Sequence, residues 1–484
     1  MVMTGKNINL TMLVDFYELT MANGYFENGM VDKIGCFDLF FRRVPDNGGF
    51  AIMAGLEQLI DYLEKLSFTD ADIEYLRQRG IFSEGFLQYL TDFKFECDVY
   101  AMPEGTPIFP GEPILTVKGP IIQAQFIETI ALLYLNHQSL IATKANRIVR
   151  AAKGRSVIEM GSRRAQGSDG AVLGARAAYI GGTNGSSCTI ADSLYGVPAL
   201  GTMAHSWVQS FDTEYDAFIK YAKLYPNNCV LLVDTYDTLK SGIPNAIKVF
   251  TEFIVPNGHF GGAIRIDSGD AAYLSKKARA MLDAAGLREV RIIISNSLDE
   301  YTIKDLLIQN APIDGFGVGE RLITSKTEPV FGGVYKLVAV ESNGELLPKI
   351  KISNNPEKVT TPGFKQVYRL FEKGTDKAIA DVLTLFDEEI DDAMPYTIFD
   401  PNYTWKRREL TDFYAVRLLV PIFEKGNLVY SKPSIEMIRQ YSEVEVSKLW
   451  EESLRFENPH KFYVDFSQRL WDLKDNLLKN HLKK

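Results

Sequence analysis

The stretch GAIRIDSGD (Gly262–Asp270) decides the fold, because a run of strand-forming apolar residues ends abruptly in polar residues and a glycine. Such a run suits a strand that is buried on both faces, as in a parallel sheet. The same pattern recurs between Val157 and Gly319, and segments typical of helices separate several of the runs. The runs are SVIEMGSRR (Ser156–Arg164), AAYIGGTNG (Ala177–Gly185), PALGTMAHS (Pro198–Ser206), CVLLVDTYDT (Cys229–Thr238), GAIRIDSGD, RIIISNSLDE (Arg291–Glu300) and DGFGVGE (Asp314–Glu320).

These runs predict strands spaced about 20–33 residues apart, close to the repeat of about 30 residues in an α/β barrel. The region, roughly Arg155–Leu337, is too short for a regular eight-fold barrel, so we expect an irregular one. Active sites of such barrels lie at the carboxyl ends of the strands. The residues expected at those ends are Arg163, Asn184, His205, Asp234, Asp267, Asn296 and Gly319.

The segments on both sides of the barrel follow other patterns. We expect an N-terminal α+β segment over 1–150, the barrel over 151–340, and a C-terminal segment of strands and then helices over 341–484. Pro and Gly between β-forming residues in Asp98–Gly119 predict short bent strands of an antiparallel sheet. Further expected elements are helices at Thr11–Phe26, Leu56–Leu66, Asp70–Arg79, Glu84–Phe93 and Ile121–Ala152, a strand at Cys36–Arg43, and hairpins within Tyr335–Phe386.

The composition is that of a globular protein with a large core: 484 residues, 46% hydrophobic and 24% charged. A formal net charge of −9 argues against nucleic acid or an anionic membrane as the main partner. We read no signal peptide and no membrane span of about 18 apolar residues. Four widely spaced cysteines suggest reduced, mostly buried thiols, and therefore a cytoplasmic protein.

The motif IRIDSGD is the most specific one. Asp267 can accept hydrogen bonds from ribose hydroxyls, and the turn after it presents backbone N–H groups at a helix start, where phosphate binds. A capping carboxylate in an ordinary βα turn is the common alternative. Arg265 is harder to explain in that way, because a guanidinium within a barrel strand needs an anionic or aromatic partner.

The motif LLVDTYDT places Asp234 at a strand end and Asp237 near the next helix start. Two carboxylates there could hold Mg²⁺ through water or contact a ribose. Capping explains Asp237 equally well.

His205, in TMAHSW, is one of five histidines. A lone histidine beside apolar residues is usually part of the core, but a strand end suits a general base, a metal ligand or a nucleophile.

Three further turns have the composition of phosphate contacts. They are the basic pair of EMGSRR, which contains Arg163, the small polar turn Ser295-Asn296-Ser297, and the glycine-rich GFGVGE around Gly319. The last motif is weak when taken alone. As the final strand end of a barrel it has the usual position of a phosphate loop.

Together these motifs resemble the nicotinate phosphoribosyltransferases. The resemblance runs in a fixed order along most of the chain: DFYELTM (Asp15–Met21), EMGSRR, GGTN, GTMAHSW, LLVDTYDT, IRIDSGD, GVG and KIKIS…KVTTPGFKQVYR (Lys349–Arg369). It implies a type II phosphoribosyltransferase fold, an α/β barrel flanked by a sandwich domain of N- and C-terminal segments. It also implies synthesis of nicotinate mononucleotide and pyrophosphate from nicotinate and 5-phosphoribosyl 1-pyrophosphate, the first step of NAD salvage from nicotinate. That reaction is coupled to ATP through a phosphohistidine, requires Mg²⁺, and is classed with the C–N ligases.

Position by position, the resemblance implies a role for each matching residue. His205 would be the phosphorylated histidine and Thr202 a nicotinate contact, while Asp267 and Asp234 would lie at the ribose. Tyr17 would cover the pyridine ring from the neighbouring subunit of a homodimer. Further substrate contacts would come from Arg163, Asn184, Arg265, Ser295, Asn296, Gly319, Lys349 and Lys351.

One departure and three alternatives remain open at this stage. Many relatives have threonine after Val-Gly, whereas this chain has Glu320, so a phosphate contact from residue 320 is in doubt. Nicotinamide phosphoribosyltransferase shares the fold and the histidine. A barrel glycosidase would use Asp234 and Asp267 as its carboxylate pair but leaves His205 and Arg265 unexplained. A non-catalytic protein that binds a phosphometabolite is the third.

Overall fold

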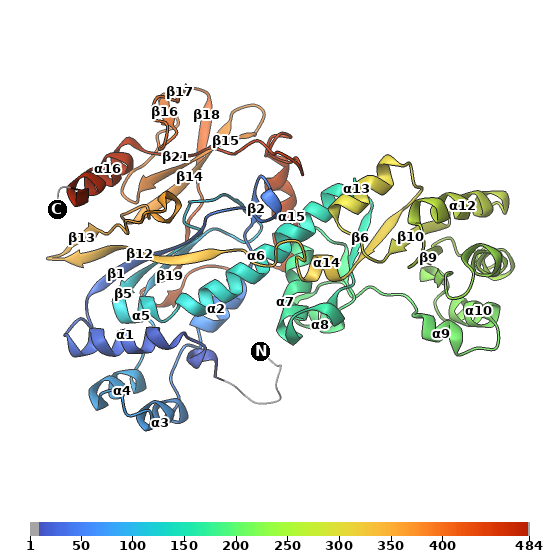
Figure 1. Ribbon diagram of the computed structural model, residues 1–484, viewed down its shortest axis with the longest axis horizontal. Coiled ribbons are helices and arrows are strands. Elements are labelled where there is room, and N and C mark those ends of the chain that lie inside the picture. Colours follow the sequence, from blue (N-terminus) through green and yellow to red (C-terminus); the bar gives the residue numbers. More distant parts are fainter. Residues whose placement is uncertain (1–8, 483–484) are drawn as a thin grey trace. The chain divides into compact units, whose positions relative to one another are not determined.

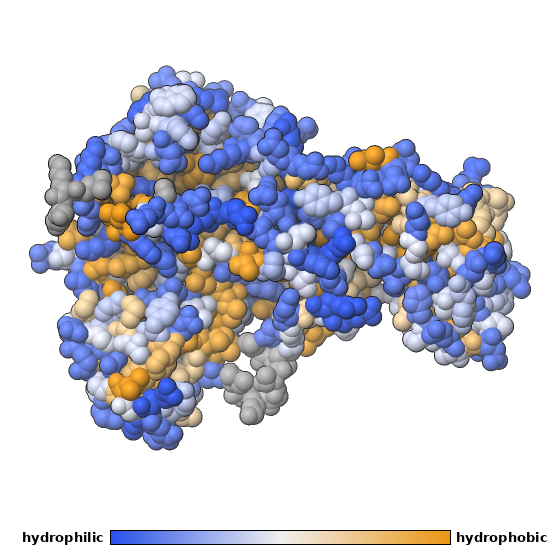
Figure 2. Space-filling model, in the orientation of Figure 1, coloured by the Kyte–Doolittle hydropathy of each residue, from blue (hydrophilic) through white to orange (hydrophobic). Residues whose placement is uncertain are grey.

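The computed structural model describes residues 9–482, which form two compact units (Figure 1). Unit 1 combines the chain up to residue 140 with the chain from residue 330 onward, and unit 2 takes residues 141–329. Hydrophilic residues cover most of the surface that Figure 2 shows, with hydrophobic side chains between them. None of the helices described between residues 9 and 482 is both long and apolar enough to cross a membrane.

Unit 2 is built on a six-stranded parallel sheet in the order β7-β6-β11-β10-β9-β8. Strands β8 and β11 are fully buried and β9 is nearly so, as a sheet covered on both faces requires. The α/β class expected from the sequence is confirmed. The strands are β6 (Ser156–Glu159), β7 (Gly185–Ser186), β8 (Val230–Leu232), β9 (Ala263–Ile266), β10 (Arg291–Ser295) and β11 (Gly315–Val318).

Helices connect these strands. Asp270 caps α12, and Gly286 follows that helix with a φ of 78°, as a glycine at a helix C-terminus does. The helices of unit 2 are the second half of α6 (Glu128–Ala151), then α7 (Gly167–Ile180), α8 (Thr189–Tyr195), α9 (His205–Gln209), α10 (Glu214–Leu224), α11 (Ile243–Val249), α12 (Ala271–Ala284), α13 (Glu300–Ile308) and α14 (Glu320–Ile323), with short η3 (Ser162–Arg164), η4 (Pro226–Asn228), η5 (Thr238–Gly242) and η6 (Phe250–Ile254).

Two of the seven strand predictions are wrong in their extent. The run Ala177–Ile180 is the last turn of α7, because AVLGARAAYI is rich in alanine, the best helix former, and is buried all round. Only Gly185 and Ser186 of that stretch form a strand. The run from Pro198 forms only one isolated β-bridge, between Ser186 and Ala199. Its first residue is a proline, which has no N–H to donate to a neighbouring strand.

Unit 1 is a sandwich made from both ends of the chain. Its seven-stranded sheet has the order β13-β12-β1-β5-β3-β19-β20, and a four-stranded sheet has the order β18-β14-β15-β21. Figure 1 shows the first sheet between helices α1, α2 and α5 and the second sheet. A buried ion pair between Lys365 of β14 and Asp38 of β1, 2.8 Å apart, joins the two sheets. The expected sandwich of N- and C-terminal segments is therefore confirmed.

Most elements within unit 1 follow the expected pattern, but the helix expected at Thr11–Phe26 begins only at Phe16, after the N-cap residue Asp15. The helix expected at Ile121–Ala152 is divided into α5 and α6, and additional strands lie between residues 396 and 428. The strands are β1 (Ile34–Phe41), β2 (Ala51–Ile52), β3 (Asp98–Ala101), β4 (Pro107–Ile108), β5 (Leu115–Pro120), β12 (Gly333–Ser342), β13 (Glu345–Pro348), β14 (Lys365–Glu372), β15 (Ala378–Leu385), β16 (Tyr396–Phe399), β17 (Arg407–Leu410), β18 (Phe413–Arg417), β19 (Val420–Glu424), β20 (Asn427–Leu428) and β21 (Val464–Phe466). The helices are α1 (Phe16–Glu27), α2 (Leu56–Leu63), α3 (Asp70–Gln78), α4 (Glu84–Thr91), α5 (Ile121–Gln125), the first half of α6, α15 (Ile435–Ser447) and α16 (Gln468–Leu482), with short η1 (Leu10–Met12), η2 (Pro45–Asn47) and η7 (Pro356–Lys358).

A buried carboxyl in unit 1 makes stability depend on pH. Glu18 of α1 accepts hydrogen bonds from the Asp15 backbone N–H (3.2 Å) and the Thr129 hydroxyl, yet burial raises the pKa of Glu18 to about 7. The folded protein therefore holds this proton more tightly than the unfolded chain does. This contribution to stability is complete below the ordinary glutamate pKa and is lost as the pH rises toward 7.

Replacing Glu18 by glutamine should remove this pH dependence. When the pH rises from 5 to 8, the free energy of unfolding of the wild type should fall by on the order of 2 kcal/mol more than that of Glu18→Gln. Denaturant unfolding at both pH values measures the difference. Exposed Glu443 of α15 offers the control, since Glu443→Gln should leave the wild-type dependence unchanged. Identical pH profiles for Glu18→Gln and the wild type would contradict the expectation.

Candidate active site

The parallel register of unit 2 brings three strand ends to one edge of the sheet. Leu232 of β8 pairs with Arg265 of β9, and Ile266 of β9 pairs with Ile294 of β10. The residues that follow these positions, Asp234, Asp267 and Ser295, therefore meet at the carboxyl edge. Their hydrogen bonds to one another define the candidate site.

Arg265 is the centre of the site. Its Nε donates to Ser295 Oγ at 3.0 Å, one terminal nitrogen donates to Thr202 Oγ1 at 2.7 Å, and the other is 3.3 Å from Asp267 Oδ1. The first terminal nitrogen also reaches the Met203 carbonyl at 3.3 Å. Asp267 is therefore the anionic partner that a guanidinium within a barrel strand was expected to need. The Arg265 side chain is 15% exposed, so it still borders open space.

The two carboxylates of the site are linked through the backbone. Asp234 Oδ2 accepts hydrogen bonds from the Asp267 N–H at 2.9 Å and from Ser268 Oγ at 2.5 Å. Asp267 Oδ1 accepts from the Ser295 hydroxyl. Asp234 Oδ1 is buried and has no hydrogen-bond partner within residues 9–482, so an acceptor of the site remains free for a ligand, an ion or a water molecule.

His205 joins this group, but not from a strand end. It is the first residue of α9, and the expectation of a strand before it is wrong because residues 200–204 follow no ladder. Its Nδ1 lies 3.1 Å from Thr235 Oγ1, and its Nε2 lies 3.9 Å from Asp267 Oδ2. The side chain is 40% exposed, so a substrate can reach the imidazole.

The two glycine turns at the ends of β6 and β11 pack directly against each other. Buried Glu159 accepts hydrogen bonds from the Gly161 N–H and from Ser186 Oγ (2.5 Å), and burial raises the pKa of Glu159. A Cβ on Gly161 would lie 2.7 Å from the Gly319 carbonyl oxygen. This packing holds the Gly319 turn, while Arg163 in η3 is exposed and available to an anion.

The turn after β10 is strained in the way that ligand-binding turns often are. Asn296 has a φ of 89° and Ser297 a φ of 54°, both in the left-handed region. Asn296 is exposed beside buried Ser295. By contrast, Asp237 and Asp270 serve as helix caps, because their carboxylates accept from backbone N–H groups of η5 and α12.

Asn184 lies elsewhere in the sheet than expected. It precedes β7 instead of ending a strand, and its backbone N–H and side-chain Oδ1 both bond to Val157, the second residue of β6. The cause is the continuation of α7 to Ile180, which shortens the strand after it. The Asn184 side chain is exposed, and its oxygen already has a backbone donor.

Three of the expected site residues belong to unit 1. Tyr17 lies in the first turn of α1 and is 43% exposed, and Lys349 and Lys351 are exposed after β13. Glu320, where the family resemblance implied threonine, forms an ion pair with Lys326 at 2.6 Å. The hydrogen bond from Lys326 and the charges of Lys326 and Arg164 lower the pKa of Glu320.

Sequence reasoning missed three residues with defined roles. Thr235 contacts His205, Ser268 contacts Asp234, and Glu159 fixes the Gly161 turn. Thr235 and Ser268 each follow a singled-out aspartate directly, which is the signal that could have found them. Glu159 gave a weaker signal, namely a carboxylate inside an otherwise apolar strand.

The fold and the site define the class of protein. The structure aligns with the human nicotinic acid phosphoribosyltransferase crystal structure with a TM-score of 0.84 at 30% identity, covering 96% of this chain and 99% of the human one. A structure described as nicotinate-nucleotide pyrophosphorylase from Pyrococcus furiosus aligns with a TM-score of 0.70 at 25% identity, covering 91% and 96%. The fold is therefore the type II phosphoribosyltransferase fold.

Sequence comparison then gives the family. Three family profiles match: the nicotinate phosphoribosyltransferase N-terminal domain over residues 12–136, the family domain over 156–374 and the C-terminal domain over 364–474. The Bacillus subtilis nicotinate phosphoribosyltransferase is 46% identical over 97% of this chain and 95% of its own length. The human enzyme is 31% identical, covering 96% of each. The chain belongs to the nicotinate phosphoribosyltransferase family, which sets aside the glycosidase alternative.

The contact between the two glycine turns predicts a cost for any side chain there. In Gly161→Ala the new Cβ would meet Ile323 Cγ2 at 2.6 Å as well as the Gly319 carbonyl, so we expect a loss of about 1–3 kcal/mol. Urea unfolding measures it. Gly201→Ala is the matched control, since no atom lies within 4 Å of its Cβ. Equal stability of the two variants would show that the turns can separate freely.

Proposed function

We propose that this enzyme condenses nicotinate with 5-phosphoribosyl 1-pyrophosphate to nicotinate mononucleotide and pyrophosphate, coupled to ATP hydrolysis. The pyridine nitrogen attacks the anomeric carbon as the bond to pyrophosphate breaks. The observation that supports it most is the cluster of Arg265, Asp267, Asp234 and His205 at one sheet edge. Pyrophosphate release with nicotinate or nicotinamide, with and without ATP, tests the proposal.

The site chemistry fits this displacement. The transition state has positive charge at the ribose ring, and Asp234 and Asp267 supply two carboxylates for it. The pyridine nitrogen is already a nucleophile, so no strong general base is required. Arg265, held by Ser295 and Thr202, would attract the nicotinate carboxylate. Exposed Arg163 and the Gly319 turn suit the phosphates.

The residues present also fit Mg²⁺, which the family resemblance implies. Asp234 Oδ1 is a buried acceptor without a protein partner among the described residues, and Asp267 is 30% exposed. Mg²⁺ is usually held by one or two carboxylates together with substrate phosphates. Residues 9–482 contain no cluster of three or more His, Cys, Asp or Glu ligands. Bound Mg²⁺ would neutralise charge on the pyrophosphate group.

For ATP coupling we propose His205 as the phosphoryl acceptor. A ring nitrogen attacks the γ-phosphate of ATP, ADP leaves, and water later cleaves the P–N bond to release phosphate. Partial exposure of the imidazole and its contact with Thr235 support this role. Asp267 Oδ2 lies 3.9 Å from the other ring nitrogen, Nε2.

His205→Ala should abolish acid-labile, base-stable phosphate on the protein and uncouple ATP hydrolysis from product formation. Some ATP-independent synthesis should survive, because the displacement itself does not use the imidazole. Incubation with γ-labelled ATP measures the phosphate. His259→Ala is the matched control, since His259 belongs to the same unit and contacts Asn227. Labelled phosphate that persists in His205→Ala contradicts the assignment.

Nicotinate should be preferred over nicotinamide. The family resemblance implies aspartate at the position of Asn184 in relatives that use the amide, and a carboxylate there would repel the acid. Since Asn184 Oδ1 accepts from the Val157 N–H, an aspartate could keep that bond and place its second, charged oxygen where the amide nitrogen stands. If the wild type turns over nicotinamide as well as or better than nicotinate at saturating phosphoribosyl pyrophosphate, the proposed preference is wrong.

Asn184→Asp tests the same point within this chain. We expect kcat/KM for nicotinate to fall at least about tenfold, which corresponds to 1.4 kcal/mol, while nicotinamide is affected less. Asn184→Ala is the control, because it removes the side-chain contact with Val157 without adding a charge. If both variants lose nicotinate activity equally, charge repulsion is not the cause.

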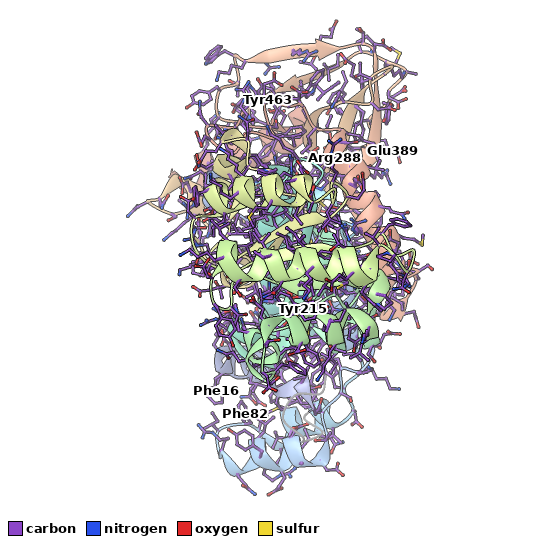
Figure 3. All side chains as sticks on the ribbon, turned by 90° about the vertical axis from the view of Figure 1, so that its right-hand side faces the viewer. Phe16, Phe82, Tyr215, Arg288, Glu389 and Tyr463 are labelled. Carbon is purple, nitrogen blue, oxygen red and sulfur yellow. The ribbon has the colours of Figure 1, made fainter. Side chains whose placement is uncertain are left out.

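We also propose a homodimer in which Tyr17 completes the site of the neighbouring subunit. Phe16 packs edge-on against Phe82, with ring centroids 6.0 Å apart (Figure 3), and Arg79 lies over its ring. Phe16 and Tyr17 nevertheless remain 45% and 43% exposed, which leaves aromatic surface available on this turn of α1. An aromatic ring stacked on a pyridine contributes roughly 0.5–1.5 kcal/mol beyond its buried area.

Mixing subunits tests the shared site. Tyr17→Ala should weaken the use of nicotinate, and Asp267→Ala should abolish turnover. In a heterodimer of the two variants, one of the two sites contains neither lesion, so activity should reappear. Mass spectrometry verifies subunit exchange. No recovery despite verified exchange means that each subunit builds its site alone.

A further inference from the structure

Unit 2 contains a second concave region, at the amino ends of β6, β10 and β11. We name it the basic cleft. Its volume is about 620 Å³, within the range of small-molecule sites. The candidate active site lies beyond the opposite, carboxyl ends of the same strands. The cleft is lined by Lys153, Gly154, Arg155, Ser156, Arg279, Arg288, Glu289, Val290, Arg291, Pro312, Ile313 and Asp314.

The lining of the basic cleft has a marked excess of positive charge. It includes five Lys or Arg side chains and only two carboxylates, in a chain whose formal net charge is −9. One of the carboxylates, Asp314, already accepts a hydrogen bond from the Ile292 N–H at 2.8 Å. This excess is therefore a local feature of the cleft and does not reflect the composition of the protein.

Two of the arginines form the fixed wall of the cleft. Arg279 bonds to Asp283 at 2.8 Å and to the carbonyl oxygens of Val290 and Leu287, both at 2.7 Å. Arg155 Nε donates to the Ile313 carbonyl at 2.8 Å. These bonds hold the loops before β6, β10 and β11 in place, so the shape of the cleft is set by the fold.

The remaining cations are available to a ligand. Lys153 and Arg288 are exposed, and their side chains have no ion pair or hydrogen bond within the described part of the chain. Arg288 comes from the turn before β10 (Figure 3). Arg291 is exposed, and the one hydrogen bond that its side chain makes among the described residues, to the Gly261 carbonyl, is 3.5 Å long. Like charges gathered on a rigid cleft repel one another, and a bound anion relieves that repulsion.

We propose that the basic cleft binds a small polyphosphate, either free or as the phosphate chain of a nucleotide. A guanidinium group can donate two parallel hydrogen bonds to the oxygens of one phosphate. Several adjacent cations therefore favour a ligand with several adjacent negative charges. A single exposed ion pair contributes little, so one carboxylate or phosphate is a poor ligand. The concave shape limits the ligand to a small molecule.

The cleft is separate from the candidate active site. Strand β10 runs from Arg291 in the cleft to Ser295 in the site, and four steps at about 3.3 Å place these residues about 13 Å apart along the strand. A phosphate chain held by Arg288 and Lys153 therefore occupies different residues from those proposed for catalysis. The two binding events can be measured independently.

Residue-resolved protection tests the proposal on the full-length protein. Phenylglyoxal modification, read by peptide mass spectrometry, reports each exposed arginine. Tripolyphosphate or ATP should slow modification of Arg288 and Arg291 at least fivefold and leave exposed Arg408 of unit 1 unchanged. Protection by tripolyphosphate alone identifies free polyphosphate, and protection by ATP alone identifies a nucleotide; either supports the cleft. Adenosine serves as the arm without phosphate.

A charge-matched pair of variants supplies the second measurement. Lys153→Gln with Arg288→Gln should weaken tripolyphosphate binding at Arg291, read by the same protection, at least tenfold. Lys276→Gln with Lys277→Gln, on α12 outside the cleft, removes the same charge and should change it less than twofold. No protection of Arg288 and Arg291 overturns the proposal. Equal protection by monophosphate also overturns it, and so does an equal loss of tripolyphosphate binding in both double variants. Either result would mean that the cleft only attracts anions in general.

Discussion

The hydrogen bond from the Asp267 backbone N–H to the Asp234 carboxylate is the contact on which the site depends. It joins the ends of two neighbouring parallel strands, so it forms only when β8 and β9 pair in the observed register. With it in place, the Asp267 side chain turns toward Ser295 and Arg265. A shift of one residue would send each of these side chains to the other face of the sheet.

Around this contact, unit 2 holds the charged side chains of the site in fixed positions by hydrogen bonds, without neutralising their charges completely. Arg265 has hydrogen-bond partners on three different segments, and Asp267 is shared between Arg265 and Ser295. Such fixed dipoles and charges are ready before a substrate binds, which is the main requirement for stabilising a charged transition state. Asp234 Oδ1 is the exception, because it is a buried acceptor without a hydrogen-bond partner among the described residues.

The sequence predicted the strands of unit 2 well where a β-branched apolar run met a polar end, as in β8, β9 and β10. It failed where the same apolar residues were small. AVLGARAAYI continues as helix α7, and this moved Asn184 ahead of a two-residue strand. His205 was singled out correctly but for the wrong structural reason, since it begins α9. The strands between residues 396 and 428 gave no pattern clear enough to predict.

The sequence by itself determined the inventory of the site: the arginine and aspartate of IRIDSGD, the aspartate of LLVDTYDT and the histidine of TMAHSW, each in a turn after an apolar segment. It also determined the fold class, because burial of alternating strands and helices leaves few arrangements. Only the tertiary structure decided which partners these groups have. Thr235 beside His205, Ser268 beside Asp234 and the basic cleft at the other end of the strands arise from contacts across the sheet. Strand register and loop packing fix such contacts, and neither is a property of any one segment.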